Sequence, residues 1–303
     1  MSPADRKPLR ASFADFVRRE FTLPEHLWHY TDGTGLLGIA SSQSLWCTEY
    51  RHLNDRKEMS IFSTRLQQHL RERLRRQLSS EDADLVVDTS DLYRTWNVFV
   101  CSFCADRDRN EHWHQYARRA GYALGFDPHV LRSLAEPQNF ILAPVFYGAE
   151  KALNVAAGVV EDQANIWQTF KSPLSKDDVR KLSRTICHLI LSFAPYFKAE
   201  AFQGERKWRL VKVTGLHGDD NKLFRSSKIF GLLGYHEFKF RIDHRGKVRL
   251  TGSPPPKLIP RIVTGPGNET EEWLRSVNPA GLLKSYGFDT SVSQSTSSLR
   301  FFE

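Results

Sequence analysis

Hydrophobic residues recur along the chain with helical and strand periods, and these periods predict its elements. Over Met59–Leu78 apolar residues return every three or four positions, which predicts one long helix with a single buried stripe. Trp96–Cys104 is a nearly continuous apolar run, typical of a central strand. A short amphipathic helix is predicted over Ala11–Phe21 and ends before Pro24, and an opening strand is predicted over Leu27–Thr31.

Shorter apolar runs separated by turn residues predict the remaining elements. Helices are expected over Leu36–Ala40, Glu111–Arg119, Ala149–Ala194 with a break at Ser172-Pro173, Glu269–Ser276 and Ala280–Tyr286. Strands are expected over Ser44–Thr48, Gly121–Phe126, Phe140–Tyr147, Lys207–Val213, Lys228–Phe230, His236–Ile242, Val248–Thr251 and Lys257–Val263. Asp55 and Glu58 have the spacing of a capping box, and the acidic segment Glu81–Asp91 is expected to be a loop or a poorly ordered link.

This order of elements predicts the fold class and the domain organisation. Helices and strands are mixed without regular βαβ alternation, and several late strands lie close together in the sequence. We therefore expect an α+β fold around a mixed, mostly antiparallel sheet. Residues 1–24 are expected to form an N-terminal helical extension. Residues 25–303 are expected to form a single domain with helical insertions near 55–92 and 149–200.

Composition adds a charge bias and a redox environment. The 43 Lys and Arg residues against 35 Asp and Glu residues give a net charge of +8, which suits an anionic partner but also fits an ordinary solvated surface. No apolar run approaches the roughly 18–20 residues that cross a bilayer, and no secretory signal is apparent. With four cysteines in such a chain, we expect free thiols, a cytoplasmic location and no membrane partner. The polar face of the long predicted helix carries Arg65, Arg71, Arg73, Arg75 and Arg76.

Two aromatic and hydroxyl-bearing motifs are candidates for ligand binding. His29, Tyr30 and Thr31 lie on the opening strand, where His29 and Thr31 face one side and Tyr30 the other. Trp113 and Tyr116 are three residues apart on a short predicted helix, so they are expected to share one face. Such a pair either packs in the core or forms a slot for a planar ring.

Two further motifs are candidates for acid chemistry and metal binding. Gln203 and Glu205 stand at the start of a predicted strand, on the same side; alternatively, Glu205 forms ordinary surface ion pairs with its basic neighbours. Cys101, Cys104, His112 and His114 carry atoms that zinc prefers. Residues three apart on a strand face opposite sides, however, so we expect no shared metal.

Taken in chain order, these motifs resemble a bacterial family catalogued as domain of unknown function 2971, often found among phage-defence and abortive-infection genes. The resemblance rests on His-Tyr-Thr at His29, Leu-Asn-Asp-x-x-Glu at Leu53–Glu58, Val-x-Ser-Phe at Val100, Trp-x-x-Tyr-Ala at Trp113, Gly-x-x-Leu-Gly-Phe at Gly121–Phe126, Glu-x-x-Trp-Arg at Glu205 and Ile-Val-x-Gly-Pro at Ile262. The chain departs from that pattern at Arg56 and His112, where proline and an apolar residue are usual.

The same order is similar to the ADP-ribosyltransferase superfamily, especially its histidine-type branch. The resemblance implies NAD as a substrate, a sheet core of that type, and transfer of ADP-ribose to a macromolecule, protein or nucleic acid, by a toxin or effector of phage defence. It implies that Glu205 stabilises the ribose cation and that Gln203 orients the nucleophile. The residues implied to bind NAD are His29, Tyr30, Thr31, Ser102, Trp113 and Tyr116. A nucleic-acid-binding or nucleic-acid-cleaving defence protein and a catalytically silent nucleotide sensor remain alternatives.

Overall fold

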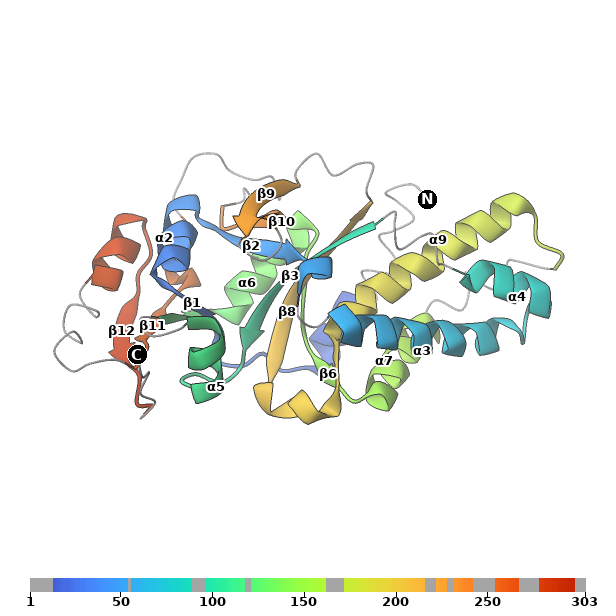
Figure 1. Ribbon diagram of the computed structural model, residues 1–303, viewed down its shortest axis with the longest axis horizontal. Coiled ribbons are helices and arrows are strands. Elements are labelled where there is room, and N and C mark those ends of the chain that lie inside the picture. Colours follow the sequence, from blue (N-terminus) through green and yellow to red (C-terminus); the bar gives the residue numbers. More distant parts are fainter. Residues whose placement is uncertain are drawn as a thin grey trace.

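The chain folds into an elongated α+β molecule, in which a broad sheet carries a group of helices at one end (Figure 1). The computed structural model describes residues 13–53, 56–88, 96–117, 121–161, 172–215, 222–227, 231–241, 254–266 and 278–297. Within these ranges, no helix is both long and apolar enough to span a membrane.

The elements follow one another without a repeating unit. The strands are β1 (Leu27–Thr31), β2 (Ser44–Glu49), β3 (Trp96–Cys104), β4 (Tyr122–Phe126), β5 (Ile141–Pro144), β6 (Phe146–Tyr147), β7 (Phe197–Lys198), β8 (Lys207–Gly215), β9 (Leu223–Ser227), β10 (Gly231–Lys239), β11 (Arg261–Thr264) and β12 (Ser291–Gln294). The α-helices are α2 (Gly33–Ser42), α3 (Arg56–Leu74), α4 (Ser80–Val87), α5 (Asn110–His112), α6 (Pro128–Ala135), α7 (Ala149–Glu161) and α9 (Lys176–Phe193), with helical segments at 13–20 and 278–285. Single turns are η1 (Tyr50–His52), the π turn η3 (Trp113–Ala117), η5 (Glu136–Gln138), η6 (Ala194–Tyr196), η7 (Glu200–Glu205) and η9 (Pro256–Leu258).

Strand β3 lies at the centre of the main sheet, and its two edges pair with different strands. One edge pairs with β8 along its whole length, from Trp96 to Cys104. The other edge pairs with β2 near Val100 and with β1 only at Cys104, so β1 and β2 separate between these points. The sheet continues as β12-β11-β4-β1 on one side and as β2-β10-β9 on the other, with β5 beyond β8. Its pairs are antiparallel except β11 with β12, which confirms the predicted α+β fold with a mostly antiparallel sheet.

Both faces of β3 are buried, and its alternating side chains divide the core into two layers. Val98 and Val100 belong to a cluster formed with α3, α4, α7 and α9, whereas Phe99 and Phe103 belong to a cluster formed with α2, α6 and β10. This two-sided burial explains why the strand reads as a continuous apolar run. The N-terminal helix joins the first cluster, since the Phe13 ring lies 4.4 Å from that of Phe193 and 5.3 Å from that of Tyr196.

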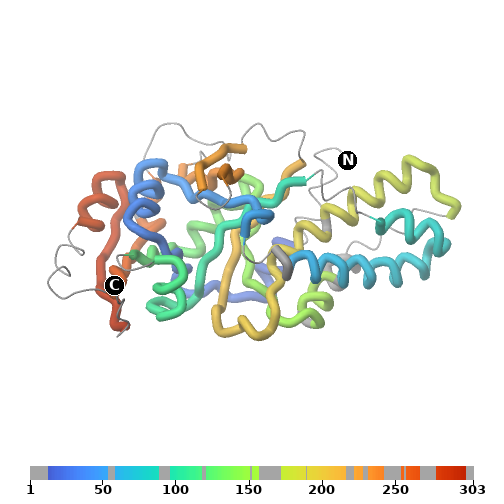
Figure 2. The backbone as a smooth tube through the Cα atoms, viewed as in Figure 1, coloured from blue at the N-terminus to red at the C-terminus, as the bar shows by residue number. Residues whose placement is uncertain are grey.

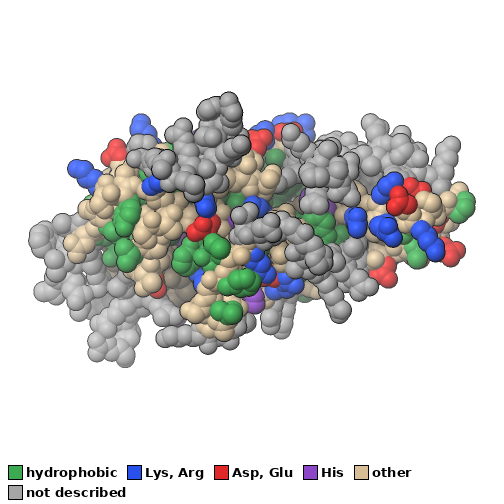
Figure 3. Space-filling model, turned by 90° about the horizontal axis from the view of Figure 1, so that it is seen from above, with side chains coloured by type: hydrophobic (Ala, Val, Ile, Leu, Met, Phe, Trp, Pro, Cys, Tyr) green, Lys and Arg blue, Asp and Glu red, His purple; other side chains and the backbone are tan. Residues whose placement is uncertain are grey.

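The helical end of the molecule is formed by α3, α4 and α9, which pack against one another (Figure 2). Seen from above, acidic and basic side chains are interspersed there (Figure 3). Arg71 on α3 and Arg75 in the turn that follows it lie 3.1 and 2.9 Å from the carboxylate of Asp84 on α4. Part of the predicted basic face of α3 is therefore neutralised within the protein.

Several predicted elements differ from the structure. Residues 81–87 of the acidic segment predicted as a loop belong to α4, whose N-terminus is capped by the Ser79 hydroxyl, and residues 89–91 lie outside the described part of the chain. The Ser-rich tail contributes β12, and β9 was not predicted. The helix predicted over Glu111–Arg119 is the short α5 followed by the π turn. The predicted strands Lys228–Phe230 and Val248–Thr251, the helix Glu269–Ser276 and the capping box at Asp55 and Glu58 lie outside the residues and side chains that the structure describes.

Candidate functional site

A cavity of about 340 Å³ lies where β1 and β2 separate at the edge of β3. This volume is within the range of small-molecule sites, and the mixture of aromatic walls and a few polar groups is typical of them. Its lining comprises Trp28, His29, Tyr30, Gly35, Gly38, Ile39, Ser44, Leu45, Trp46, Thr48, Leu53, Val100, Cys101, Ser102, Cys104, Tyr116, Lys207 and Arg225. The cavity therefore joins residues that are more than a hundred positions apart in the sequence.

His29 on β1 contacts β3 in the region where β1 and β2 separate. Its Nδ1 lies 3.1 Å from the carbonyl oxygen of Ser102, on the part of β3 where neither β1 nor β2 is paired. Because a carbonyl oxygen only accepts, Nδ1 carries the proton of this hydrogen bond. Burial disfavours the charged ring, but the nearby Cys101 thiolate and the hydrogen bonds to Cys101 and Ser102 outweigh it, so the pKa of His29 is raised.

A chain of three side chains runs from the cavity to Glu205. The Tyr116 hydroxyl lies 3.0 Å from Lys207 Nζ, and Lys207 Nζ lies 3.2 Å from Glu205 Oε2. The same oxygen lies 2.5 Å from Lys198 Nζ. Both lysine side chains are 4% exposed and that of Glu205 is 21% exposed, so one carboxylate compensates two largely buried ammonium groups.

Four of the residues predicted to bind a ligand line the cavity together: His29, Tyr30, Ser102 and Tyr116. Thr31 and Trp113 do not line it. The Thr31 hydroxyl instead occupies the space beside Gly35, where it would lie 1.9 Å from a Cβ atom placed on that glycine.

The prediction that Trp113 and Tyr116 share one face is wrong. The Trp113 side chain is fully buried, with its indole N–H donated to Asp108 at 2.8 Å and its ring 4.9 Å from that of Tyr30. Tyr116 is 39% exposed. The segment is a π turn, which takes more residues per turn than an α-helix and so rotates positions three apart away from each other. Trp113 therefore belongs to the core, and Tyr116 alone presents its ring to the cavity.

The predicted strand positions of Gln203 and Glu205 are also wrong. Both lie in the single turn η7, and Arg206, in the left-handed conformation with φ 43°, separates them from β8. Gln203 is exposed, whereas Glu205 turns toward the two lysines. The two side chains therefore do not form a pair on one strand face.

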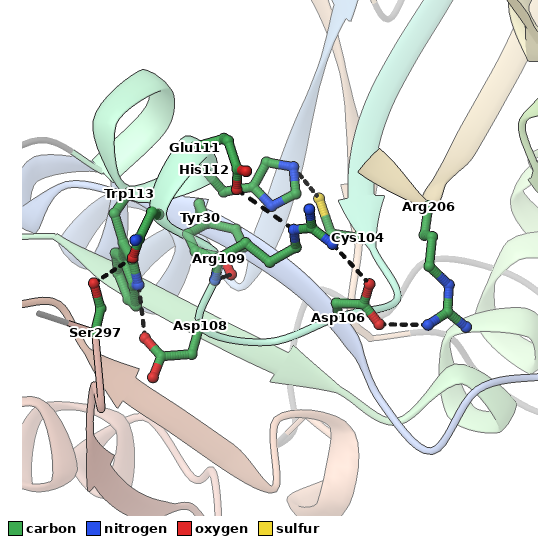
Figure 4. A network of polar contacts seen from close by, with 11 residues as sticks. Tyr30, Cys104, Asp106, Asp108, Arg109, Glu111, His112, Trp113, Arg206 and Ser297 are labelled. Atoms are coloured by element: carbon green, nitrogen blue, oxygen red, sulfur yellow. Dashed lines mark hydrogen bonds and ion pairs between the residues drawn. The ribbon is translucent and has the colours of Figure 1, made fainter. Parts of the chain in front are cut away.

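A polar network behind the cavity holds the loop between β3 and α5 (Figure 4). The Arg109 guanidinium lies between Asp106 and Glu111, at 3.5 Å from each carboxylate, and its backbone N–H donates to the Tyr30 hydroxyl at 3.2 Å. Asp108 accepts hydrogen bonds from Trp113 and from Ser295 and Thr296 in the C-terminal segment. Burial alone would raise the pKa of Asp108, but these hydrogen bonds outweigh it and lower that pKa. The network thus holds the Tyr30 hydroxyl and attaches the C-terminal residues Ser295 and Thr296 to the loop between β3 and α5.

Sequence reasoning missed several of the polar groups in this cavity. Lys207 and Arg225 bring positive charge to it, and the Arg225 guanidinium donates to Thr48 at 3.0 Å and lies 5.6 Å from the Trp46 ring centroid. Cys101, considered above only as a metal ligand, lines the cavity beside His29. A lysine or a cysteine in a strand carries no sequence signal of such a role.

The cysteine and histidine residues considered for zinc are arranged differently from a metal centre. Cys104 Sγ lies 3.3 Å from His112 Nε2, while Cys101 and Cys104 pack into different hydrophobic clusters. Burial, and then the positive charge of Lys207, lower the pKa of His112 to about 4. Among the described residues there is no group of three or more His, Cys, Asp or Glu side chains that could hold a metal ion.

Comparison with known proteins gives one finding. Residues 112–210, about a third of the chain, match a family described as "Protein of unknown function (DUF2971)". The matched segment includes Tyr116, Glu205 and Lys207, while His29 and Cys101 precede it. Neither the curated proteins nor the solved structures that were compared give a match.

Proposed function

We propose that the cavity binds NAD, that the protein cleaves the bond between nicotinamide and ribose, and that it transfers ADP-ribose to a macromolecule. The observation that carries the proposal is the split between β1 and β2, which gathers His29, Ser102, Tyr116 and Lys207 around one cavity. Glu205 does not line the cavity itself, but its carboxylate lies 3.2 Å from Lys207 Nζ. The match of residues 112–210 supports the assignment to a family but gives it no activity.

Binding of a dinucleotide is supported by the kinds of groups that meet there. The half-exposed Tyr116 ring offers a face to a flat heterocycle, and Trp28 and Trp46 add aromatic walls. Lys207 and Arg225 supply charge for a pyrophosphate, with the arginine able to bind it bidentately. His29 is held by the Ser102 carbonyl and is therefore oriented before a ribose hydroxyl arrives.

The chemistry requires stabilisation of a positive charge on the ribose. When the C1′–N bond breaks, its electron pair leaves with nicotinamide, which becomes neutral, and C1′ acquires oxocarbenium character. A carboxylate beside the sugar stabilises that charge, and we propose Glu205 for this role because its Oε2 lies 3.2 Å from Nζ of Lys207, which lines the cavity. The acceptor then forms a bond to C1′ and loses its proton. Lys198 and Lys207 both contact Oε2 of this carboxylate.

The cellular setting is part of the proposal. All four cysteines are free and buried, which supports a reducing, cytoplasmic environment. In that setting we propose that the protein is an effector of phage defence, as its sequence resemblance implies.

The direct test is incubation of the full-length protein with NAD, followed by chromatography for free nicotinamide and by transfer of label from NAD labelled in its adenine. Release of nicotinamide with label on protein or nucleic acid is the expected result. Binding of NAD without release would overturn the enzyme assignment in favour of a nucleotide sensor. Cleavage of nucleic acid without any effect of NAD would overturn the ligand assignment as well.

A further inference from the structure

Two cysteines face each other across the point where β2 leaves β3. The last paired residues before the split are Thr48 with Val100, so Cys47 and Cys101 occupy the next positions on the two strands. Both belong to the same hydrophobic cluster and are in hydrogen-bonding contact. Paired residues of antiparallel strands, such as Thr48 and Val100, have Cα atoms about 4.5–5.5 Å apart, within the range that a disulfide spans, and Cys47 and Cys101 follow one position later.

Only one of these two thiols is next to the cavity. Cys101 is 4% exposed and lines the cavity, whereas Cys47 is completely buried behind it and does not line it. A small polar molecule that enters the cavity therefore reaches Cys101 first. Cys47 is placed to react only with the sulfur of Cys101.

The surroundings of Cys101 favour its thiolate. His29 Nδ1, whose proton is fixed by the hydrogen bond to the Ser102 carbonyl, lies 3.8 Å from Cys101 Sγ. The hydrogen bond from Cys47 and the charge of His29 outweigh burial and lower the pKa of Cys101 to about 5. Burial and the neighbouring Cys101 raise the pKa of Cys47, so Cys47 keeps its proton and is the donor.

We propose that Cys101 is a site of oxidation by peroxides and that Cys47 resolves the product to a Cys47–Cys101 disulfide across the two strands. The inference rests on the thiol pair, His29 and the cavity, and it needs no part of the proposed function. NAD turnover therefore does not enter its test.

Each of the two steps forms one new bond to the Cys101 sulfur and releases one water. The Cys101 thiolate attacks one oxygen of hydrogen peroxide; an S–O bond forms, the O–O bond breaks, and the departing hydroxide takes a proton and becomes water. Cys101 sulfur is oxidised by two electrons and the peroxide is reduced. The sulfur of Cys47 then attacks Cys101 sulfur; an S–S bond forms, the S–O bond breaks, and the hydroxide leaves with the Cys47 proton as a second water.

Cys104 is a matched control within the same cavity. It also lines the cavity and is 5% exposed, but burial raises its pKa to about 12. At pH 7 its thiolate fraction is about 10⁵ lower than that of Cys101, and its greater intrinsic nucleophilicity recovers about 10³ of this difference. We therefore expect Cys101 to react about 10²-fold faster than Cys104. Between about pH 6 and pH 8 the rate at Cys101 should stay flat, whereas that at Cys104 should rise about tenfold per pH unit.

The test is mass spectrometry of the reduced full-length protein after a short exposure to hydrogen peroxide. Free thiols are blocked with iodoacetamide and the protein is digested without reductant. The expected product is a peptide that joins Cys47 to Cys101. In Cys47→Ser the sulfenic acid has no partner, so dimedone should label Cys101, and Cys104→Ser should behave as the wild type.

The time course of the wild-type protein decides the matter even if a variant fails to fold. Oxidation of Cys104 at the same rate as Cys101 would overturn the proposal. So would oxidised Cys101 in the wild type without a linked peptide, or a rate at Cys101 that rises tenfold per pH unit.

Discussion

Replacing Glu205 with Gln should destabilise the protein, because Glu205 compensates two buried lysines. The substitution removes the negative charge and leaves Lys198 and Lys207, each 4% exposed, next to a neutral amide. Breaking a fully buried ion pair costs about 3–5 kcal/mol, and an exposed pair contributes about 0–1 kcal/mol. Since Glu205 is 21% exposed, we expect an intermediate loss of about 2 kcal/mol in the free energy of unfolding.

This loss is measurable by urea denaturation and by the melting temperature. For a chain of 303 residues about 2 kcal/mol corresponds to a decrease of roughly 3 °C. The control is Glu200→Gln, because Glu200 lies in the same turn, is exposed, and should change stability by less than about 0.5 kcal/mol. The double variant Glu205→Gln with Lys198→Met should recover part of the loss, since the Lys198 side chain lies over the Phe202 ring and Met can pack there. A Glu205→Gln protein as stable as Glu200→Gln would refute the reasoning.

Three further predictions follow from the cavity and its surroundings. Gly35→Ala should destabilise the protein by about 1–3 kcal/mol in urea denaturation, because the new Cβ meets the Thr31 hydroxyl. Gly38→Ala is the control, because a Cβ atom at Gly38 has nothing within 4 Å. His112 should be neutral in the folded protein, because its pKa is about 4 there and about 6.5 in the unfolded chain. As the pH falls, the unfolded chain takes up this proton first, so the free energy of unfolding should fall by about 2 kcal/mol from pH 7 to pH 5. His112→Asn should remove that part of the pH dependence. Tyr116→Ala should weaken binding of NAD about tenfold in calorimetry while Tyr116→Phe retains it, and equal affinities of both variants would contradict stacking on Tyr116.

The strands with strong apolar patterns could be predicted from the sequence, and the elements held by polar contacts could not. The bounds of β1 and β3 match the prediction because burial on β3 and alternation on β1 leave a direct trace in the sequence. Helix α4 is acidic, and its partners Arg71 and Arg75 lie at the end of α3 and in the turn that follows it. Strand β12 is Ser-rich and pairs through its backbone with β11, which requires no apolar side chain.

Some residues of the candidate site could likewise be predicted from the sequence, and others could not. The resemblance in motif order predicted His29, Ser102 and Tyr116 as parts of one site, and the structure places them in one cavity. Lys207 reads as an ordinary basic residue, and its burial depends on Glu205, which reaches it from the neighbouring turn. Trp113 follows the π turn into the core, a local geometry that the sequence does not signal.

The rate of nicotinamide release by Glu205→Gln, compared with the wild type and with Glu200→Gln, tests the proposed activity most directly. The assay belongs well below the melting temperature of the variant, at equal concentrations of folded protein and with saturating NAD. If the carboxylate stabilises the ribose cation, Glu205→Gln should still bind NAD and release nicotinamide roughly 10²–10³-fold more slowly, while Glu200→Gln keeps the wild-type rate. A folded Glu205→Gln protein that releases nicotinamide at the wild-type rate, or a wild-type protein that releases none, would contradict the account.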